Sequence, residues 1–448
     1  MKDKLFGTDG IRGIVNSPPL TKKDIAVISR YVSLILNKVY NNQKVVIGWD
    51  TRESSLWISE IIFKEFLKAG YEVYNVGVFP TSAISFLCRD LKAIGVVVSA
   101  SHNPYNFNGI KFFSPFGEKL PTKLEEEIES HIRNKIKISS LRKKGKLFEY
   151  YSQAEQKYIE FLTKNFLKDI KLEEKVKFPL VIDCANGATY KIAPKIFSNF
   201  FSNVRFINTY PDGKNINHNC GAVCPEVLKK ETSLGEIGIS FDGDGDRVIF
   251  IDEKNTIRDG DYVLGVLATE YKKNKILKNS LIVVSVMSNL GLLKYLWAKN
   301  IKVIQCPVGD KYVSEYLKEY KGNLGGEQAG HIVLYDYLPT GDGILTALEI
   351  LKVVLKNKKK LYSLCSIFEK YPQIIKNVET TKKPPLEEIF DKDFIKNLEQ
   401  KIQGRIVLRY SGTEPLFRIM VEGKDKLKIK KAADIIEEKF LKSLKKFN

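Results

Sequence analysis

Short apolar runs, each followed by a polar turn and an amphipathic stretch, recur at roughly domain-length intervals along the chain. They lie at residues 44–50, 178–184 and 279–288 and are rich in valine, isoleucine and leucine. Near-continuous apolar strands that alternate with helices are typical of sheets covered by helices. In the first unit, Ser54 or Ser55 can cap the helix and Gly70 can end it. The pattern predicts three α/β domains of similar build.

The last part of the chain has a different pattern. Residues 404–410 and 416–422 are predicted to form a hairpin, and an amphipathic helix follows at residues 425–440. This indicates a smaller C-terminal α+β domain. Because a single core stops growing well below 448 residues, we predict domains at residues 1–150, 151–252, 253–365 and 366–448.

The basic charge of the chain changes this picture little. The formal net charge is +19, but all except twelve of the 72 basic residues are lysines spread along the whole length. No helix-turn-helix, zinc-finger or aromatic-basic motif accompanies them, so we expect a solvated lysine-rich surface and no nucleic-acid partner.

Cysteines and apolar runs indicate the compartment. Six scattered cysteines suggest no disulfide framework. The N-terminus lacks a signal-peptide pattern, and no apolar run approaches the roughly 20 residues of a membrane span. We therefore expect a cytoplasmic protein with no membrane partner, either a monomer or a homodimer.

The few arginines are placed differently from the lysines. Five of the twelve lie in motifs rich in Gly, Asp, Ser and Thr, namely Arg12, Arg52, Arg247, Arg409 and Arg418. A guanidinium grips phosphate or carboxylate oxygens in pairs, whereas an ammonium is a point charge. These positions therefore indicate recognition of phosphate or carboxylate groups.

Three aspartates, Asp242, Asp244 and Asp246, alternate with glycines between two apolar strands. The glycines let the backbone turn so that the carboxylates converge, and converging carboxylates repel unless a hard cation lies among them. A calcium-binding EF-hand does not fit, because Arg247 stands where that loop needs glycine and the flanks are not helices. A solvated acidic turn is the alternative, but the density of acids beside an arginine favours Mg²⁺.

A predicted buried strand ends in the small-residue turn SASHNP at residues 99–104, which contains Ser101. Proteins of the α/β class expose reactive side chains at such strand ends. Taken alone the pattern is weak, because Asn-Pro also marks ordinary turns. The Gly-X-Ser-X-Gly pattern of hydrolases is missing.

The hairpin loop near the C-terminus offers many hydrogen-bond donors. It contains Arg409, Ser411, Thr413 and Arg418 around a glycine turn, a combination suited to a phosphate dianion. A plain hairpin turn is the alternative, but it would not need two of only twelve arginines.

A glycine-rich loop at residues 325–331 carries Glu327 and His331, which can hold sugar hydroxyls. A histidine that only packs in a turn is the alternative for His331. The chain has no P-loop and no Gly-x-Gly-x-x-Gly after a strand. A metal loop and phosphate donors without a nucleotide site indicate phosphoryl transfer that is neither that of a kinase nor that of an NTPase.

Together these motifs resemble the α-D-phosphohexomutases, and among them most the bacterial phosphoglucosamine mutases. The resemblance covers essentially the whole chain and is carried by the two loops just described, by the acidic loop and by FGTDGIRG at 6–13, SASHNP at 99–104, NGIKFF at 108–113, VMSNLGL at 286–292 and VGDKYV at 308–313. It implies an α/β fold of three similar domains, with mixed sheets sandwiched by helices, plus a smaller C-terminal α+β domain, around a central cleft.

The resemblance also implies roles for individual residues. Ser101 would carry a phosphate that completes a Mg²⁺ site with Asp242, Asp244 and Asp246. The other implied catalytic residues are Arg12 and Lys111 beside that phosphate, with Lys111 and His331 as candidate general acids or bases. The implied substrate-binding residues are Arg247, Glu327, Arg409, Ser411, Thr413 and Arg418.

The implied activity is that of an isomerase, an intramolecular phosphotransferase that interconverts glucosamine 6-phosphate and glucosamine 1-phosphate for the synthesis of UDP-N-acetylglucosamine and cell-wall precursors. A hexosamine 1,6-bisphosphate would be the intermediate and activator. Ala329 stands where the family's sugar loop usually has serine, and one neutral hydrogen bond is worth about 0.5–1.5 kcal/mol. We therefore expect relaxed sugar selection. A phosphomannomutase or phosphoglucomutase on the same scaffold is the alternative.

Overall fold

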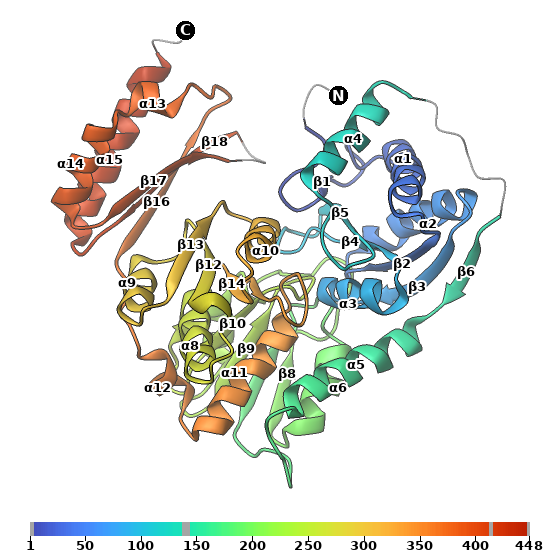
Figure 1. Ribbon diagram of the computed structural model, residues 1–448, viewed down its shortest axis with the longest axis horizontal. Helices are drawn as coiled ribbons and strands as arrows, with labels where there is room; N and C mark the ends of the chain where they lie inside the picture. The colour runs from blue at the N-terminus through green and yellow to red at the C-terminus, as the bar shows by residue number, and fades with distance from the viewer. Residues whose placement is uncertain (1–3, 137–143, 412–414, 446–448) are drawn as a thin grey trace.

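The computed structural model describes residues 4–136, 144–411 and 415–445, which form four sheets in chain order (Figure 1). The first sheet has the order β1-β5-β4-β2-β3-β6. Its strands β2, β3, β4 and β6 pair in parallel, and β5 is antiparallel to both its neighbours. The bounds are β1 Ile11–Ile14, β2 Lys44–Trp49, β3 Glu72–Val78, β4 Ile94–Val98, β5 Phe107–Phe113 and β6 Lys146–Glu149, with helices α1 Lys22–Tyr40, α2 Glu53–Lys68, α3 Thr81–Leu91 and α4 Thr122–Arg133.

The second and third sheets are also mixed. The second has the order β11-β10-β9-β7-β8 and the third β13-β12-β14-β15. Second-sheet bounds are β7 Leu180–Asp183, β8 Val204–Ile207, β9 Ile237–Phe241, β10 Val248–Ile251 and β11 Ile257–Arg258, with α5 Tyr151–Leu167, α6 Ile192–Phe200 and α7 Pro225–Glu231. Third-sheet bounds are β12 Leu281–Ser285, β13 Lys302–Cys306, β14 Leu324–Gly326 and β15 Ile332–Leu334, with α8 Gly260–Lys273, α9 Leu290–Ala298, α10 Asp310–Glu319, α11 Gly343–Asn357 and α12 Leu361–Cys365. The predicted α/β class is confirmed.

The C-terminal sheet is smaller and fully antiparallel, with the order β16-β18-β17. Its bounds are β16 Gln373–Glu379, β17 Arg405–Tyr410 and β18 Leu416–Glu422, with α13 Leu386–Ile389, α14 Lys392–Ile402 and α15 Lys426–Leu444. The helices lie together on one side of this sheet, as Figure 1 shows. The predicted hairpin and closing helix are therefore confirmed.

Alternating side chains of the first sheet belong to two different cores. Val45 and Ile47 on β2 pack with α1, α2 and α4, whereas Val46 belongs to a larger cluster that contains α3 and α5. The larger cluster continues into both the second and the third sheet. The C-terminal sheet has a separate core with Phe417 and Phe440. The first three sheets are thus joined through shared apolar contacts.

The start of α2 corrects one prediction. The helix begins at Glu53 with Arg52 at its N-cap, and no side chain caps it. Ser55 instead donates to Asp50 Oδ1 at 2.7 Å, and Asn108 donates to the hydroxyls of both Ser54 and Ser55. The prediction that a serine caps this helix is wrong because buried polar partners compete for the hydroxyls. Gly70 follows the helix at φ +82°, as its ending requires. None of the helices in the described part of the chain is long and apolar enough to cross a membrane.

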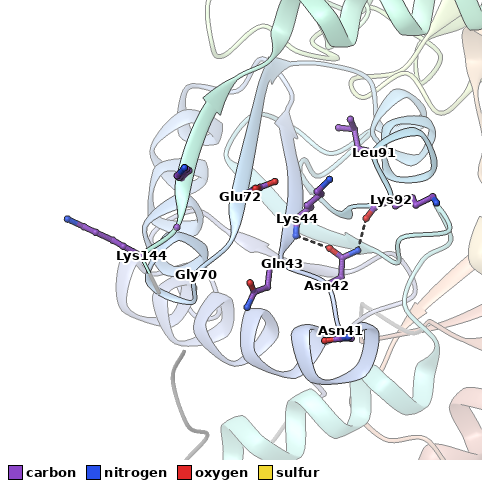
Figure 2. Close-up of a pocket in the computed structure, with 11 residues that line it drawn as sticks. Asn41, Asn42, Gln43, Lys44, Gly70, Glu72, Leu91, Lys92 and Lys144 are labelled. Carbon is purple, nitrogen blue, oxygen red and sulfur yellow. Dashed lines mark hydrogen bonds between the residues drawn. The ribbon is translucent and has the colours of Figure 1, made fainter. Parts of the chain in front are cut away.

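A surface hollow of about 610 Å³ lies at the amino ends of β2, β3 and β6 (Figure 2). Asn42 accepts from the Lys44 N–H at 2.8 Å and donates to the Lys92 carbonyl at 2.6 Å, which ties its rim together. Figure 2 shows the Lys144 side chain extending away from this pair. The candidate chemistry lies at the opposite, carboxyl ends of the strands.

The separate C-terminal core leads to a stability prediction. Phe417 is fully buried and its ring centroid lies 4.0 Å from that of Phe440. Phe417→Ala should cost the C-terminal domain about 3–5 kcal/mol, as core phenylalanine deletions do. We expect amide hydrogen exchange to rise in β16–β18 and α15 and to stay unchanged in the other three sheets. Leu427→Ala, at a side chain that is 73% exposed, is the control and should change stability by less than about 0.5 kcal/mol. An equal loss of protection in all four sheets would contradict a separate core.

Candidate active site

The turn after β4 presents a buried serine. Ser101 adopts a left-handed conformation with φ +50°, which is uncommon for a residue other than glycine. Its N–H donates to Ser99 Oγ at 2.8 Å, and its own hydroxyl donates to Asp242 Oδ2 at 2.7 Å. The turn therefore aims the Ser101 hydroxyl at the acidic loop of the second sheet.

Two residues that the sequence did not assign to the site hold this turn. Arg52, fully buried and paired with Asp50, donates to the carbonyls of Ser101 at 3.3 Å and of Asn103 at 2.5 Å. Asn217 donates to the Ser101 carbonyl at 2.8 Å. The sequence singled out Arg52 as an arginine retained in a lysine-rich chain, but it did not indicate the partners of Arg52.

The three aspartates lie on the turn between β9 and β10, and all are fully buried. A Cβ on Gly243 would lie 2.6 Å from the Ser101 carbonyl oxygen, so only glycine lets the two turns approach this closely. One carboxylate oxygen from each of Asp242, Asp244 and Asp246 lies within 4.8 Å of the others. The Oδ1 atoms of Asp244 and Asp246 are buried and have no hydrogen-bond partner among the residues that the structure describes. This donor set fits a hard cation, and the cluster can bind a metal ion.

The pKa values of these aspartates reflect the crowding. Burial and the charge of Asp244 raise the pKa of Asp242 to about 6 and that of Asp246 well above its ordinary value. Burial also acts to raise the pKa of Asp244, but the Lys111 ammonium lowers it overall. Repulsion of this kind is relieved when a cation binds.

Lys111, on β5, is the principal counter-charge. Its Nζ lies 2.8 Å from Asp244 Oδ2, 3.3 Å from Asp246 Oδ2 and 2.9 Å from Asp9 Oδ2. Burial would lower its pKa, but the surrounding carboxylates raise that pKa well above its ordinary value. Lys111 is therefore held as an ammonium, which can donate a proton but not accept one.

The loop between β14 and β15 brings the third sheet to the same place. His331 Nε2 lies 3.4 Å from Asp246 Oδ1. Burial, followed by the charge of Arg247, lowers the pKa of His331 to about 3, so the imidazole is neutral near pH 7. Glu327 accepts from the Gly309 N–H at 2.9 Å, and Arg247 Nε lies 3.8 Å from Asp242 Oδ2.

Arg12, on β1, lies at the rim of the serine turn. It donates to Asn103 Oδ1 at 3.1 Å and pairs with Asp9. Asp9 also contacts Lys111 and Lys119. The sequence did not single out Asp9, although it lies in the FGTDGIRG segment.

The predicted phosphate-binding residues of the hairpin lie in the C-terminal sheet. Arg409 and Arg418 face each other across β17 and β18, and Ser411 is buried and donates its N–H to the Leu416 carbonyl at 2.8 Å. In Figure 1 these strand ends are directed toward the first domain. Thr413 lies outside the described residues. The site residues of the first three sheets thus form one cluster, whereas Arg409, Ser411 and Arg418 belong to the hairpin of the C-terminal domain.

Known proteins resemble the chain over its full length. Domain models of phosphoglucomutase/phosphomannomutase match it in order: α/β/α domain I at residues 3–138, domain II at 156–256, domain III at 259–371 and the C-terminal domain at 351–439. The phosphoglucosamine mutase of Brucella ovis is 41% identical over 445 residues, which covers 98% of each chain.

Solved structures share the fold. A phosphoglucomutase/phosphomannomutase family protein from Burkholderia thailandensis superposes with a TM-score of 0.77 at 22% identity, over 99% of this chain and 97% of that one. The N-acetylphosphoglucosamine mutase of Aspergillus fumigatus in complex with GlcNAc-6P and magnesium superposes with a TM-score of 0.67 at 17% identity, over 97% and 95%. With four domain matches and 41% identity to a curated relative across nearly all of both chains, the chain belongs to the phosphoglucomutase/phosphomannomutase family.

Proposed function

We propose that the protein is a phosphoglucosamine mutase that interconverts glucosamine 6-phosphate and glucosamine 1-phosphate through a phosphorylated Ser101. The observation that carries the proposal is the 2.7 Å hydrogen bond from the buried Ser101 hydroxyl to Asp242, on a loop of three carboxylates. The 41% identity to phosphoglucosamine mutases supports the choice of sugar.

The reaction balances as two phosphoryl transfers. In the first, the bond from Ser101 Oγ to phosphorus breaks, a bond from phosphorus to the sugar O1 forms, and the hydroxyl proton of O1 ends on Ser101 Oγ. In the second, the hexosamine 1,6-bisphosphate has turned round, its O6–phosphorus bond breaks, and the serine is phosphorylated again while O6 takes the proton. We propose His331 and Lys111 as the groups that exchange the sugar hydroxyl proton, since both lie beside Asp246 of the acidic loop.

Mg²⁺ is the ion that we propose for the acidic loop. Asp242, Asp244 and Asp246, with the phosphate on Ser101, would hold it, and the unpartnered buried oxygens of Asp244 and Asp246 fit such a ligand set. When bound, it supplies positive charge to the oxygens of the transferring phosphoryl group.

Substrate recognition is proposed for groups around this centre. Arg12 would contact the phosphoserine, and Glu327 and Arg247 would bind the sugar. Arg409, Ser411, Thr413 and Arg418 would bind the phosphate that is not reacting, because paired guanidinium groups suit a phosphate dianion. We propose that the four predicted domains each contribute one of these loops, that the chain acts in the cytoplasm as a monomer or homodimer, and that it uses neither nucleic acid nor membrane as a partner.

A second candidate is activity on mannose or glucose phosphates. It is favoured by Ala329, which occupies an exposed position in the loop that carries Glu327 and His331. An alanine there removes one hydroxyl that could contact the sugar.

Replacing the nucleophile tests the mechanism directly. Ser101→Ala should lower kcat by at least about 1000-fold while sugar phosphate still binds, because a nucleophile has no substitute in a covalent route. Intact mass should show a phosphate-sized increment on the parent protein that the variant lacks. Near-normal turnover by the variant would refute the phosphoserine.

Replacing a metal ligand tests the acidic loop. Asp244→Asn should weaken Mg²⁺ binding at least about tenfold, since even changes to groups that only support metal ligands cost 10–100-fold. Calorimetric titration with Mg²⁺ measures this without turnover. The control is Glu174→Gln, on a side chain that is 78% exposed. An unchanged Mg²⁺ titration for the Asp244 variant would rule out this site.

Restoring the hydroxyl at position 329 tests sugar selection. Ala329→Ser should raise kcat/KM for glucosamine 1-phosphate by about 2- to 13-fold, the equivalent of one neutral hydrogen bond. Mannose and glucose 1-phosphates, assayed beside it with an activating bisphosphate, should gain less. If the unmodified protein prefers glucose or mannose phosphate by kcat/KM, the second candidate replaces the first.

A further inference from the structure

Six titratable side chains at the candidate site contact one another in a closed ring, in which acidic and basic residues alternate. In order around the ring they are Asp246, Lys111, Asp9, Lys119, Asp310 and His331. The ring crosses three sheets, because Asp246 belongs to the second, Asp310 and His331 to the third and the rest to the first. Three of its members, Asp9, Lys119 and Asp310, have no role in the mechanism proposed above.

Lys119 is the link between the first and third domains. Its side chain, only 8% exposed, comes from the segment between β5 and α4. The ammonium contacts Asp9 in its own domain and lies 2.5 Å from Asp310 Oδ1 at the start of α10. Burial would lower its pKa, but Asp310 and Asp9 raise it above the ordinary value, so the bridge stays charged. Salt in solution weakens an ion pair that is buried away from water far less than it weakens a pair at the surface.

Asp310 also lies close to His331. Its Oδ2 lies 4.0 Å from His331 Nδ1, and both atoms are buried with no hydrogen-bond partner in the described part of the chain. A carboxylate that accepts a hydrogen bond from one ring nitrogen orients an imidazole and leaves the other nitrogen directed at the reaction centre. At 4.0 Å, Asp310 Oδ2 and His331 Nδ1 are near this geometry without forming the hydrogen bond. Here that other nitrogen is Nε2, next to Asp246.

The neighbouring residue strengthens the contact between the two domains. Lys311 Nζ lies 2.6 Å from Glu125 Oε2, and both side chains are nearly inaccessible to water. Two adjacent residues at the start of α10 therefore each form a buried ion pair with the first domain.

A metal ion is a weaker explanation for this cluster. Asp246, Asp310 and His331 offer one ligand atom each within 4.8 Å of one another. However, Lys119 already neutralises Asp310, and Lys111 already contacts Asp246. The carboxylates are thus paired with cations from the first domain without a further ion.

We propose that Lys119 and Asp310 are positioning residues, which hold His331 and the sugar loop of the third domain in register with Ser101 and the acidic loop. Neither residue touches the reacting atoms. The proposal rests on the proposed function for its kinetic consequence, but not for its structural one. Misplacing a reacting group by about 1 Å costs on the order of 100-fold in rate.

Kinetics on three variants of the full chain test it. Lys119→Met should lower kcat by about 10- to 100-fold and change KM by less than about threefold, because chemistry and not sugar binding loses its alignment. Lys119→Arg keeps a cation between the carboxylates and should recover at least about fivefold of that loss. The matched control is Lys318→Met, which removes the exposed pair that Lys318 makes with Glu118 across the same boundary and should leave kcat unchanged.

Hydrogen exchange gives a readout that needs no turnover. Lys119→Met should speed exchange in residues 308–313 and 325–331, and Lys318→Met should not. If the parent protein shows no mutase activity but this exchange pattern appears, the proposed function fails and the positioning role stands. If mutase activity is present and Lys119→Met changes neither kcat nor exchange, the positioning role fails and the function stands.

A double-mutant cycle checks that the two residues act through one contact. Asp310→Asn alone should resemble Lys119→Met, and the double variant should be no more than about threefold worse than either. Asp310→Asn also carries the test if Lys119→Met does not fold. Multiplicative losses in kcat would overturn the shared role.

Discussion

The site is organised by one electrostatic constraint, the burial of three carboxylates on a single turn. Asp242, Asp244 and Asp246 are fully inaccessible to water, and their oxygens lie within 4.8 Å of one another. Two ionised carboxylates about 4 Å apart would repel by about 4 kcal/mol at an effective dielectric constant near 20. The raised pKa values of Asp242 and Asp246 reflect this repulsion together with burial. The turn therefore favours cations beside it, and the surrounding structure supplies them.

Those cations come from elements far apart in the chain. Lys111 reaches the turn from β5 of the first sheet, more than 100 residues away in the chain. Arg247 is the exception, because it directly follows Asp246. Gly243 lets the serine turn of the first sheet approach to a distance that any side chain would block. The charge of the acidic loop thus explains why these domains must pack with their strand ends together. The apolar core that runs through the first three sheets holds them in that arrangement.

Sequence reasoning located the elements of the site better than the contacts between them. The runs at residues 44–50, 178–184 and 279–288 contain strands β2, β7 and β12. A short continuous apolar run bounded by turns is typical of a buried strand. The chemistry of the acidic loop could also be predicted. Three acids and two glycines in five positions bring carboxylates together, which costs free energy unless a cation lies beside them. The roles of Asp9, Lys119 and Asp310 could not be predicted from the sequence, because single acids and lysines are common in a chain with 72 basic residues. Their roles depend on contacts between segments that are more than 100 residues apart in the chain.

The surroundings of the ring also give Lys111 and His331 different protonation states. Lys111 lies among three carboxylates, which raise its pKa and keep the proton on it. His331 is buried near Arg247, and its lowered pKa keeps the proton off. Both contact Asp246 and are its two neighbours in the ring. One carboxylate therefore lies between a protonated ammonium and a neutral imidazole. The carboxylate charge that makes the acidic turn costly to bury therefore holds the proton on Lys111, whereas burial and the charge of Arg247 keep the imidazole of His331 neutral.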